Sequence, residues 1–156
     1  MPTDPIEYAG FWLRVGASLI DTVLVVCITV PVFVTFYGWS YFDAPKTGFV
    51  AGVFDFMISW FVPAVAAIWF WLHRQATPGK IAVSARVVDA RTGDTMTLRQ
   101  SIVRYLGYFV STIPFGLGLL WVGFDSKKQG WHDKLAGTVV IRSKNRGAEP
   151  VRFEQT

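Results

Sequence analysis

This chain has few charged residues, and it lacks the residue patterns that are typical of a water-soluble enzyme. Charged residues make up 17% of its 156 residues, whereas hydrophobic residues make up 52% and aromatic residues 16%. The mean hydropathy is +0.37. This composition excludes an ordinary soluble domain and favours a membrane protein with aromatic anchors at the interfaces. The one cysteine, Cys27, lies in an apolar run, so a disulfide framework within the chain is excluded.

The sequence also lacks the patterns that carry most enzyme chemistry. The only two histidines, His73 and His132, are not at a metal-ligand spacing, and there is no nucleophile elbow or fixed pair of carboxylates. The segment "TPGK" at 77–80 lacks the other glycine and the Ser/Thr of a phosphate-binding loop. We therefore expect no enzyme, no cofactor and no metal site.

Three long apolar runs are present instead. The first, about Trp12 to Tyr37, and the second, about Phe49 to Leu72, exceed the ~20 residues that cross a bilayer. We expect both to be transmembrane helices, the first not being a cleavable signal peptide. The third, Tyr105 to Phe124, is interrupted by Pro114, Gly116 and Gly118, which disfavours a continuous helix.

The positive charges predict how these runs cross the membrane. Of the 15 Lys and Arg residues, six lie between residues 73 and 104 and seven follow residue 124, whereas the linker between the first two runs has only Lys46. The positive-inside rule places both rich segments, and hence the N-terminus, in the cytoplasm. Because the two basic segments lie on the same side of the membrane, the third run, which joins them, must enter the membrane and return as two half-helices. A third full crossing with a misplaced basic tail is the competing interpretation.

Two segments have the character of β-strands. Apolar residues alternate from Ile81 to Val88 between Pro78-Gly79 and a turn near Gly93, which predicts a small β-hairpin. Residues 137–142, "GTVVIR", form a plausible partner strand near the C-terminus. The fold class is therefore an α-helical membrane protein with two full spans, a broken or re-entrant third segment and a small cytoplasmic hairpin.

Polar residues form a stripe along the first apolar run. Helical spacing brings Arg14, Ser18 and Asp21 onto one face, which should contact protein or water because lipid offers no hydrogen bonds. We expect Arg14 to extend toward the headgroups, since it lies ~10 Å along the helix from Asp21. Asp21 then needs another partner, and the candidates are Arg104, His132 and Lys134.

Three segments of this sequence resemble segments of a known protein family. "GFWLRVGASLID", "TPGKIAVSARVVDARTG" and "GWHDKLAGTVVI" are similar, in order and spacing, to the opening, middle and closing segments of RDD-family membrane proteins. The resemblance implies that Arg14 is the family arginine, Asp21 the first aspartate and Asp133 the second, with Asp89 as the alternative. It also implies a role in transport, since some members are reported to exchange monovalent cations for protons.

Three of the aspartates admit more than one interpretation. Asp21, with Ser18 beside it, either binds a cation or proton or makes a structural salt bridge or hydrogen bond. Asp55, in the second run, is either hydrated near the outer interface or a second ion site. Asp133, next to His132, is expected to cap a short helix or to pair with Arg14.

These observations predict one RDD-like membrane domain over residues 1–142 and a basic cytoplasmic tail over 143–156. The expected function is ion-coupled transport with Asp21 as the ion or proton site. The alternative is an accessory or assembly subunit that docks on another membrane protein through the Arg/Asp stripe. Two spans cannot enclose an aqueous path, so we expect a homo-oligomer or a larger complex. We expect anionic lipid rather than nucleic acid at its basic face, in the cytoplasmic membrane of a bacterium.

Overall fold

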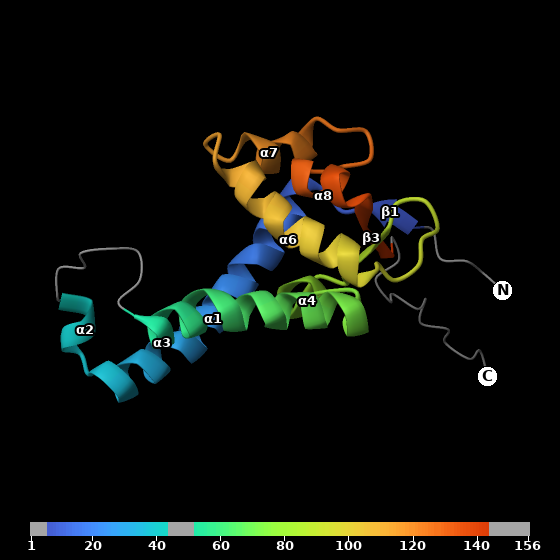
Figure 1. Ribbon diagram of the computed structural model, residues 1–156. Coiled ribbons are helices and arrows are strands. Elements are labelled where there is room, and N and C mark those ends of the chain that lie inside the picture. The colour runs from blue at the N-terminus through green and yellow to red at the C-terminus, as the bar shows by residue number, and fades with distance from the viewer. Residues whose placement is uncertain (1–5, 44–51, 144–156) are drawn as a thin grey trace, which may run out of the picture.

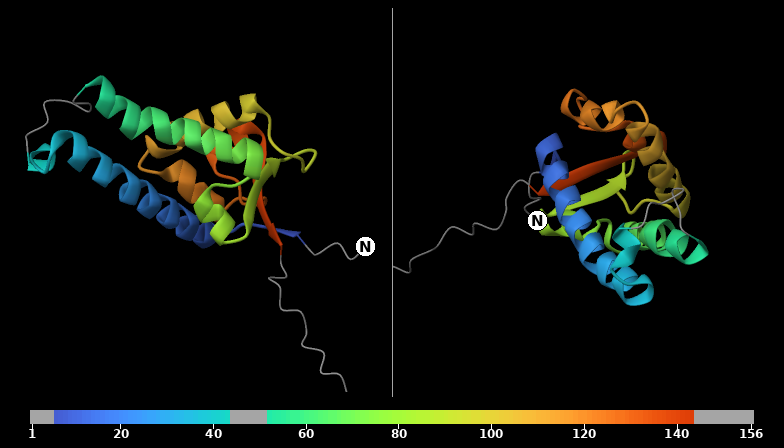
Figure 2. Two further views of the ribbon diagram at one scale, coloured as in Figure 1. Left: turned by 90° about the horizontal axis from the view of Figure 1, so that it is seen from below. Right: turned by 90° about the vertical axis from the view of Figure 1, so that its left-hand side faces the viewer.

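The computed structural model describes residues 6–43 and 52–143 (Figure 1). Lys46 and all but the first residue of the expected basic tail lie outside the described residues. Two long helical segments extend from a small sheet in the same direction, and a third, bent segment packs beside them (Figure 2). The expected fold class is confirmed: the chain is mostly helical, with two apolar spans, a bent third pair and a small antiparallel sheet.

The two long helices follow the first two apolar runs. Helix α1 covers Phe11–Tyr37 and is followed by the short α2, Ser40–Asp43. The second span is one helix of 22 residues, made of α3 (Val53–Phe56), a π-helical stretch (Met57–Phe61) and α4 (Val62–Arg74). Both are long and apolar enough to cross a membrane, and only 6% of the most apolar window of each is buried within the chain. Most of their surface therefore requires an apolar surrounding.

Three strands join into one antiparallel sheet at one end of the molecule. The strands are β1 (Ile6–Tyr8), β2 (Ala85–Asp89) and β3 (Thr138–Ser143), in the order β1-β3-β2. The expected pairing of residues 137–142 with the middle segment is confirmed, with Val87 opposite Val140. Strand β1, which the sequence analysis did not predict, pairs Tyr8 with Ile141.

The middle segment differs from the predicted hairpin. Pro78–Ala82 forms a short helix, α5, so Ile81 belongs to a helix and not to a strand. Asp89 and Asp94 close a turn, with the Asp89 N–H 2.9 Å from the Asp94 carbonyl oxygen, and no second strand follows in residues 90–97. The physical reason is that β2 satisfies its backbone by pairing with β3, so a local partner strand is not needed.

The third apolar run is bent rather than straight. Helix α6 (Leu98–Thr112) is followed by α7 (Leu117–Leu120) and a 3₁₀ turn (Trp121–Gly123), and the two parts meet at an angle of 112°. Gly116 at the bend has φ +75°, a conformation that glycine adopts without strain. The bend thus follows from the Pro114–Gly116 interruption.

Both ends of this bent run are tied to the sheet. Before it, Gln100 donates to Asp89 at the end of β2, with Nε2 and Oδ2 2.5 Å apart. After it, Gln129 Nε2 donates to the Thr138 carbonyl oxygen at the start of β3, 2.8 Å away. Strand β1 leads into α1, and β2 follows α4 and α5. Because these strands belong to one sheet, each of the three apolar segments has an end beside that sheet. This geometry supports the re-entrant interpretation of the third run.

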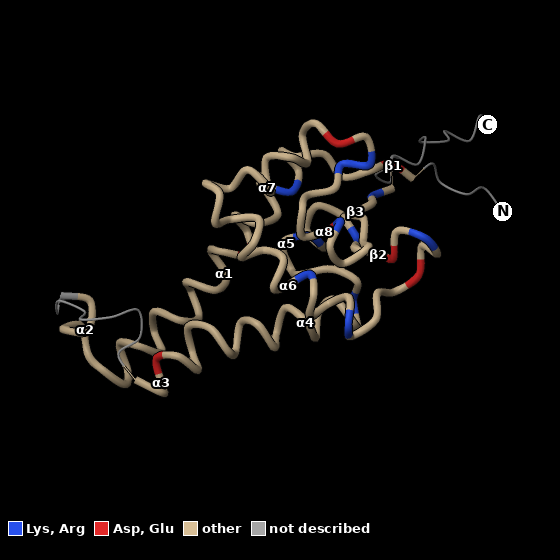
Figure 3. Tube along the Cα trace, turned by 45° about the horizontal axis from the view of Figure 1, so that its top comes forward, with Lys and Arg blue, Asp and Glu red and all other residues tan. Residues whose placement is uncertain are grey.

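The core lies where the sheet meets the helices. Trp71 of α4, Val87, Met96 and Val140 are each at most 2% exposed and belong to one cluster, against which Tyr105 of α6 packs. Burial of such side chains stabilises the fold by roughly 1.5–3 kcal/mol each. Figure 3 shows Lys and Arg concentrated at this end. By contrast, α1 carries no charged residue after Asp21, and α4 carries none before Arg74.

Candidate functional site

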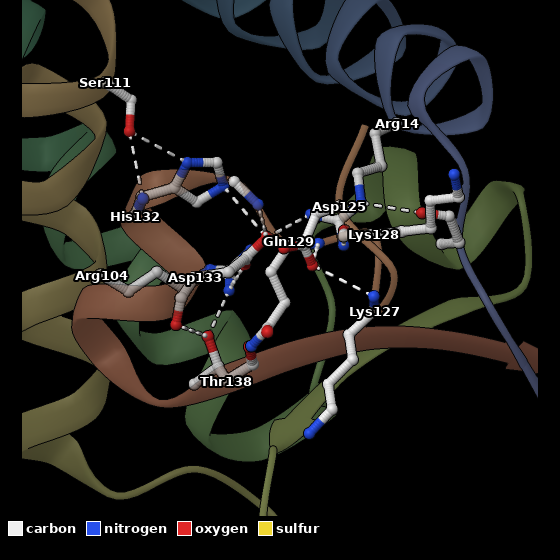
Figure 4. Close-up of polar contacts among 12 residues, drawn as sticks. Arg14, Arg104, Ser111, Asp125, Lys127, Lys128, Gln129, His132, Asp133 and Thr138 are labelled. Atoms are coloured by element: carbon white, nitrogen blue, oxygen red, sulfur yellow. Dashed lines mark hydrogen bonds and ion pairs between the residues drawn. The ribbon is translucent and has the colours of Figure 1, made fainter. Parts of the chain in front are cut away.

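Asp133 lies between two arginine side chains that come from distant parts of the sequence (Figure 4). Arg14 Nη1 donates to Asp133 Oδ2 at 2.5 Å, and Arg104 Nη1 donates to Asp133 Oδ1. The side chains of Asp133 and Arg104 are 0% exposed, and that of Arg14 is 11% exposed. Each carboxylate oxygen thus has its own charged donor, which is the condition under which a buried charge is tolerated.

The two arginines connect this carboxylate to the rest of the fold. Arg14 also donates from Nε to the Ala9 carbonyl oxygen (3.0 Å) and from Nη2 to that of Lys128 (2.5 Å). Arg104 donates to Thr138 Oγ1 at 2.6 Å and lies 5.4 Å from the centre of the Trp71 ring, within cation–π range. The cluster therefore ties α1, α4, α6 and β3 to the segment that carries Asp133.

Asp133 is placed by a short helix, α8 (Trp131–Ala136). Its Oδ2 accepts the N–H of Gly130, the residue before the helix, at 3.0 Å. An acid in the first turn also interacts favourably with the helix dipole. Asp133 thus both caps a short helix and pairs with Arg14, and both roles expected from the sequence are confirmed.

Burial and charge fix the protonation states at this cluster. Burial alone would raise the pKa of Asp133, but the guanidinium groups of Arg104 and Arg14 outweigh it and hold that pKa well below its usual range. Burial, helped by the nearby cations, lowers the pKa of His132 to about 3, although Asp133 opposes this shift. Asp133 is therefore ionised and His132 neutral at neutral pH.

His132 packs against helix α6. Its ring stacks on Tyr108 of α6 with centroids 4.0 Å apart, and its Nδ1 lies 3.3 Å from Ser111 Oγ. The same hydroxyl accepts the His132 backbone N–H at 3.1 Å. His132 thus serves to attach α8 to α6.

Asp21 accepts hydrogen bonds from the start of α5. Thr77 Oγ1 donates to Asp21 Oδ2 and the Gly79 N–H donates to Oδ1, each at 2.6 Å. The carboxylate thereby satisfies donors of the first turn of a helix that has no side-chain cap of its own. Lys80 Nζ in turn donates to Thr77 Oγ1 at 3.3 Å. Asp21 therefore fastens α5 to the side of α1.

The partners expected for Asp21 are consequently wrong. Arg104 and His132 face Asp133 and Ser111, and Lys134 pairs with Asp125 at 2.5 Å. The expected path of Arg14 to the headgroups is also wrong, since its guanidinium is held by Asp133. The physical reason is that α5 supplies neutral donors directly against α1, so Asp21 needs no cation.

Gly79 permits this close contact between α5 and α1. A Cβ atom at position 79 would lie 2.0 Å from the Ala17 carbonyl oxygen and 2.9 Å from Asp21 Cγ. Any side chain there would separate the two helices. The sequence carried a signal for this element, because Thr77 followed by Pro78 is a typical helix start, with threonine at the N-cap and proline at N1.

The other residues singled out in the sequence lie apart from these contacts. Ser18 is exposed on α1, one turn from Asp21. Asp55 is 4% exposed at the far end of the molecule, where it accepts from the Tyr41 hydroxyl and, at 3.3 Å, from Ser59. The structure therefore does not show Asp55 as a fully hydrated side chain. Asp89, the alternative second aspartate, instead caps the exposed turn after β2 through the N–H groups of Arg91 and Thr92.

Within residues 6–43 and 52–143, no three His, Cys, Asp or Glu side chains lie close enough to hold a metal ion.

Similar proteins fall into two groups by the extent of the match. The chain is 43% identical to the uncharacterized protein RP437 of Rickettsia prowazekii over 49% of its own length and 42% of that protein. It is 29% identical to a proline-rich antigen of Mycobacterium leprae over 58% of its length and 38% of the antigen. The chain thus spans about two fifths of these relatives. It is also 27% identical to an uncharacterized membrane protein, YteJ, of Bacillus subtilis, covering 88% of this chain and 82% of YteJ.

No solved structure matches the chain. The model of the RDD family matches residues 8–137, which include the Arg14, Asp21 and Asp133 contacts described above. With this match, two apolar helices able to span a bilayer and a membrane relative matched over 88% of this chain, the chain is a transmembrane protein and belongs to the RDD family.

Proposed function

We propose that this protein is a non-catalytic accessory or assembly subunit of a larger membrane complex. The observation that carries the proposal is that both acids implied by the family resemblance, Asp21 and Asp133, bind donors of the same chain. Their contacts fix the arrangement of the helices. Neither carboxylate needs a transported ion as its partner.

We propose a docking surface other than the Arg/Asp stripe expected in the sequence analysis. Arg14 and Asp21 are turned toward α8 and α5, so the Arg/Asp stripe serves the interior of this fold. The long faces of α1 and α4 are uncovered instead: Val23 and Ile28 are 60% and 68% exposed, and Val65 is 50% exposed. We infer that a partner helix or a second copy packs on part of this surface.

The charge distribution supports an orientation. Basic residues are concentrated at the sheet end (Figure 3). Under the positive-inside rule this supports our proposal that the sheet and the N-terminus lie on the cytoplasmic side of a bacterial membrane. Anionic headgroups are attracted to this end.

Tryptophan scanning of the exposed faces tests the docking proposal. Tryptophan is tolerated where lipid covers a helix, whereas it clashes where a partner helix packs against it. At Ile20, Val23, Ile28 and Val65 we expect co-purification of the partner, or of a second tagged copy, to fall at positions on one helix face only. Uniform tolerance would contradict docking through α1 or α4.

Ion-coupled transport is the second candidate. The observation that favours it is that Asp21 is only partly buried, so a proton or monovalent cation has access to its carboxylate. Purified protein in vesicles with a proton gradient distinguishes the two functions. The accessory role predicts no sodium, lithium or potassium flux. Flux that disappears in Asp21→Asn without loss of the oligomer would favour the carrier.

A further inference from the structure

A cleft of about 390 Å³ lies beside the polar stripe of α1. It is bounded by α1, by α6 and by the α7 segment, and its walls are mostly apolar, with Val15 and Leu19 on one side and Phe115, Leu119 and Leu120 on the other. Its volume falls within the range of about 300–1,000 Å³ that is typical of small-molecule sites. The cleft is therefore large enough for an extended apolar chain.

One part of the cleft is cationic. Lys80 lines it and is 7% exposed, and Arg14 lines it together with the hydroxyl-bearing Ser18 and Thr22. Among the residues that the structure describes, no carboxylate oxygen lies within 4.0 Å of Lys80 Nζ, whose hydrogen bond goes to Thr77 Oγ1 at 3.3 Å. An ammonium group has three donors. Lys80 is thus a buried cation with unused hydrogen-bonding capacity, facing an apolar cleft.

The surrounding charges do not cancel. The cluster holds three cations, Arg14, Arg104 and Lys80, and two carboxylates, Asp21 and Asp133. The histidine that lines the cleft is neutral at neutral pH. One positive charge is therefore in excess where burial makes an unpaired charge unfavourable, and a bound anion would balance it.

We propose that this cleft binds one anionic phospholipid, with an acyl chain along its apolar walls and phosphate oxygens that accept hydrogen bonds from Lys80 and Arg14. Its position supports a lipid over a free anion. The cleft follows α1 from Phe11 to Thr22, ~16 Å of helix beginning at the sheet end, which covers headgroup and upper acyl depth. Phe115 and Leu120 on its wall are 99% and 46% exposed, so the cleft lies beside exposed apolar surface of the kind that lipid favours. This site is independent of the function proposed above.

Native mass spectrometry of the purified full chain tests the site. The protein is exchanged into micelles that contain equal amounts of phosphatidylglycerol and phosphatidylcholine, and the bound lipids are counted. We expect one phosphatidylglycerol to be retained in preference to phosphatidylcholine. Equal retention of the two lipids would overturn the proposal. So would competition by millimolar inorganic phosphate, which would identify a free-anion site.

Three variants locate the binding. Lys80→Gln should reduce the preference for phosphatidylglycerol by about tenfold, the loss expected for one charge-assisted hydrogen bond. Ser18→Phe keeps Lys80, places bulk in the cleft from an exposed position, and should reduce retention of the lipid if Lys80→Gln fails to fold. Lys127→Gln removes one exposed positive charge outside the cleft and should leave the preference unchanged. An equal loss in Lys127→Gln would overturn the site in favour of general surface attraction.

Discussion

Asp133 and Asp21 are both held by donors of this chain, but by donors of different charge. Asp133 is fully buried between two guanidinium groups, one from α1 and one from α6. Asp21 is partly exposed and accepts from a hydroxyl and a backbone N–H at the start of α5. One acid joins three distant segments through charge, and the other joins two helices as a cap.

The difference indicates which contact the fold depends on more. Removing the Asp133 charge leaves two buried cations without a counter-ion, which destabilises strongly. Removing the Asp21 charge leaves an oxygen that still accepts a hydrogen bond, and the donors are neutral. The predictions below test this ranking.

The largest effect is expected for Asp133→Asn. Loss of the carboxylate leaves Arg104 and Arg14 buried without compensation, and the free energy of unfolding in mild detergent should fall by about 3–5 kcal/mol. Titration with dodecyl sulfate, followed by circular dichroism, measures it. Glu7→Gln is the matched control, since the Glu7–Arg142 pair is about one-third exposed and should contribute only ~0–1 kcal/mol. Equal losses in the two variants would contradict the ranking.

Gly79→Ala should have the next largest effect. Its Cβ would lie 2.0 Å from the Ala17 carbonyl oxygen, so α5 must move away from α1 at a cost of about 2 kcal/mol or more. Gly16→Ala, where no atom lies within 4 Å of the new Cβ, should instead be neutral or stabilise α1 by up to ~1 kcal/mol. The same titration compares them, and a tolerated alanine at 79 would disprove the close contact.

Asp21→Asn should cost about 1 kcal/mol, because the amide oxygen still accepts the Gly79 N–H while the Thr77 contact is weakened. Asp21→Ala, which loses both bonds, should cost about twice as much. The ratio between the two separates a cap from an ion pair. If Asn and Ala were equally damaging, the charge of Asp21 would matter more than its oxygens.

The smallest effect at neutral pH concerns His132. Its folded pKa is about 3 against 6.5 for the free group, so the unfolded chain takes up a proton as pH falls below about 6.5 and the folded chain does not. Stability should therefore decrease from about pH 6.5 down to about pH 3, with less than about 1 kcal/mol lost between pH 7.5 and 6.0. Unfolding titrations at several pH values measure this slope.

Two histidine variants isolate the source of the slope. His132→Gln should flatten it, whereas His73→Gln, which keeps the buried histidine, should preserve it. A slope that survives in His132→Gln would show that another group is responsible.

Much of the fold could be predicted because hydrophobicity and charge act locally. The length of the first apolar run predicted α1, and the Pro114–Gly116 interruption predicted that the third run is broken. The distribution of Lys and Arg predicts that this run returns to the same side of the membrane, and this stays a prediction. The pairing of residues 137–142 with the middle segment followed from the same reasoning about a shared side. These features depend on composition over many residues.

The partners within the site were harder to predict because they depend on packing. The sequence indicated that Asp21 needs a partner, and the structure supplies a helix start instead of a cation, because Gly79 lets α5 approach α1. Similarly, nothing in the sequence of α1 shows that α8 brings Asp133 to Arg14, although this pairing was one of the two roles predicted for Asp133. Contacts between segments 58 and 119 residues apart are set by the whole fold.

A double-mutant cycle between Arg14→Gln and Asp133→Asn tests the central claim most directly, namely that the buried ion pair holds the first helix to the closing segment. The free energy of unfolding is measured for the wild type, both single variants and the double variant. Because the two groups touch, we predict a coupling energy above about 1.5 kcal/mol. Additive effects, with coupling within about 0.5 kcal/mol of zero, would contradict the account.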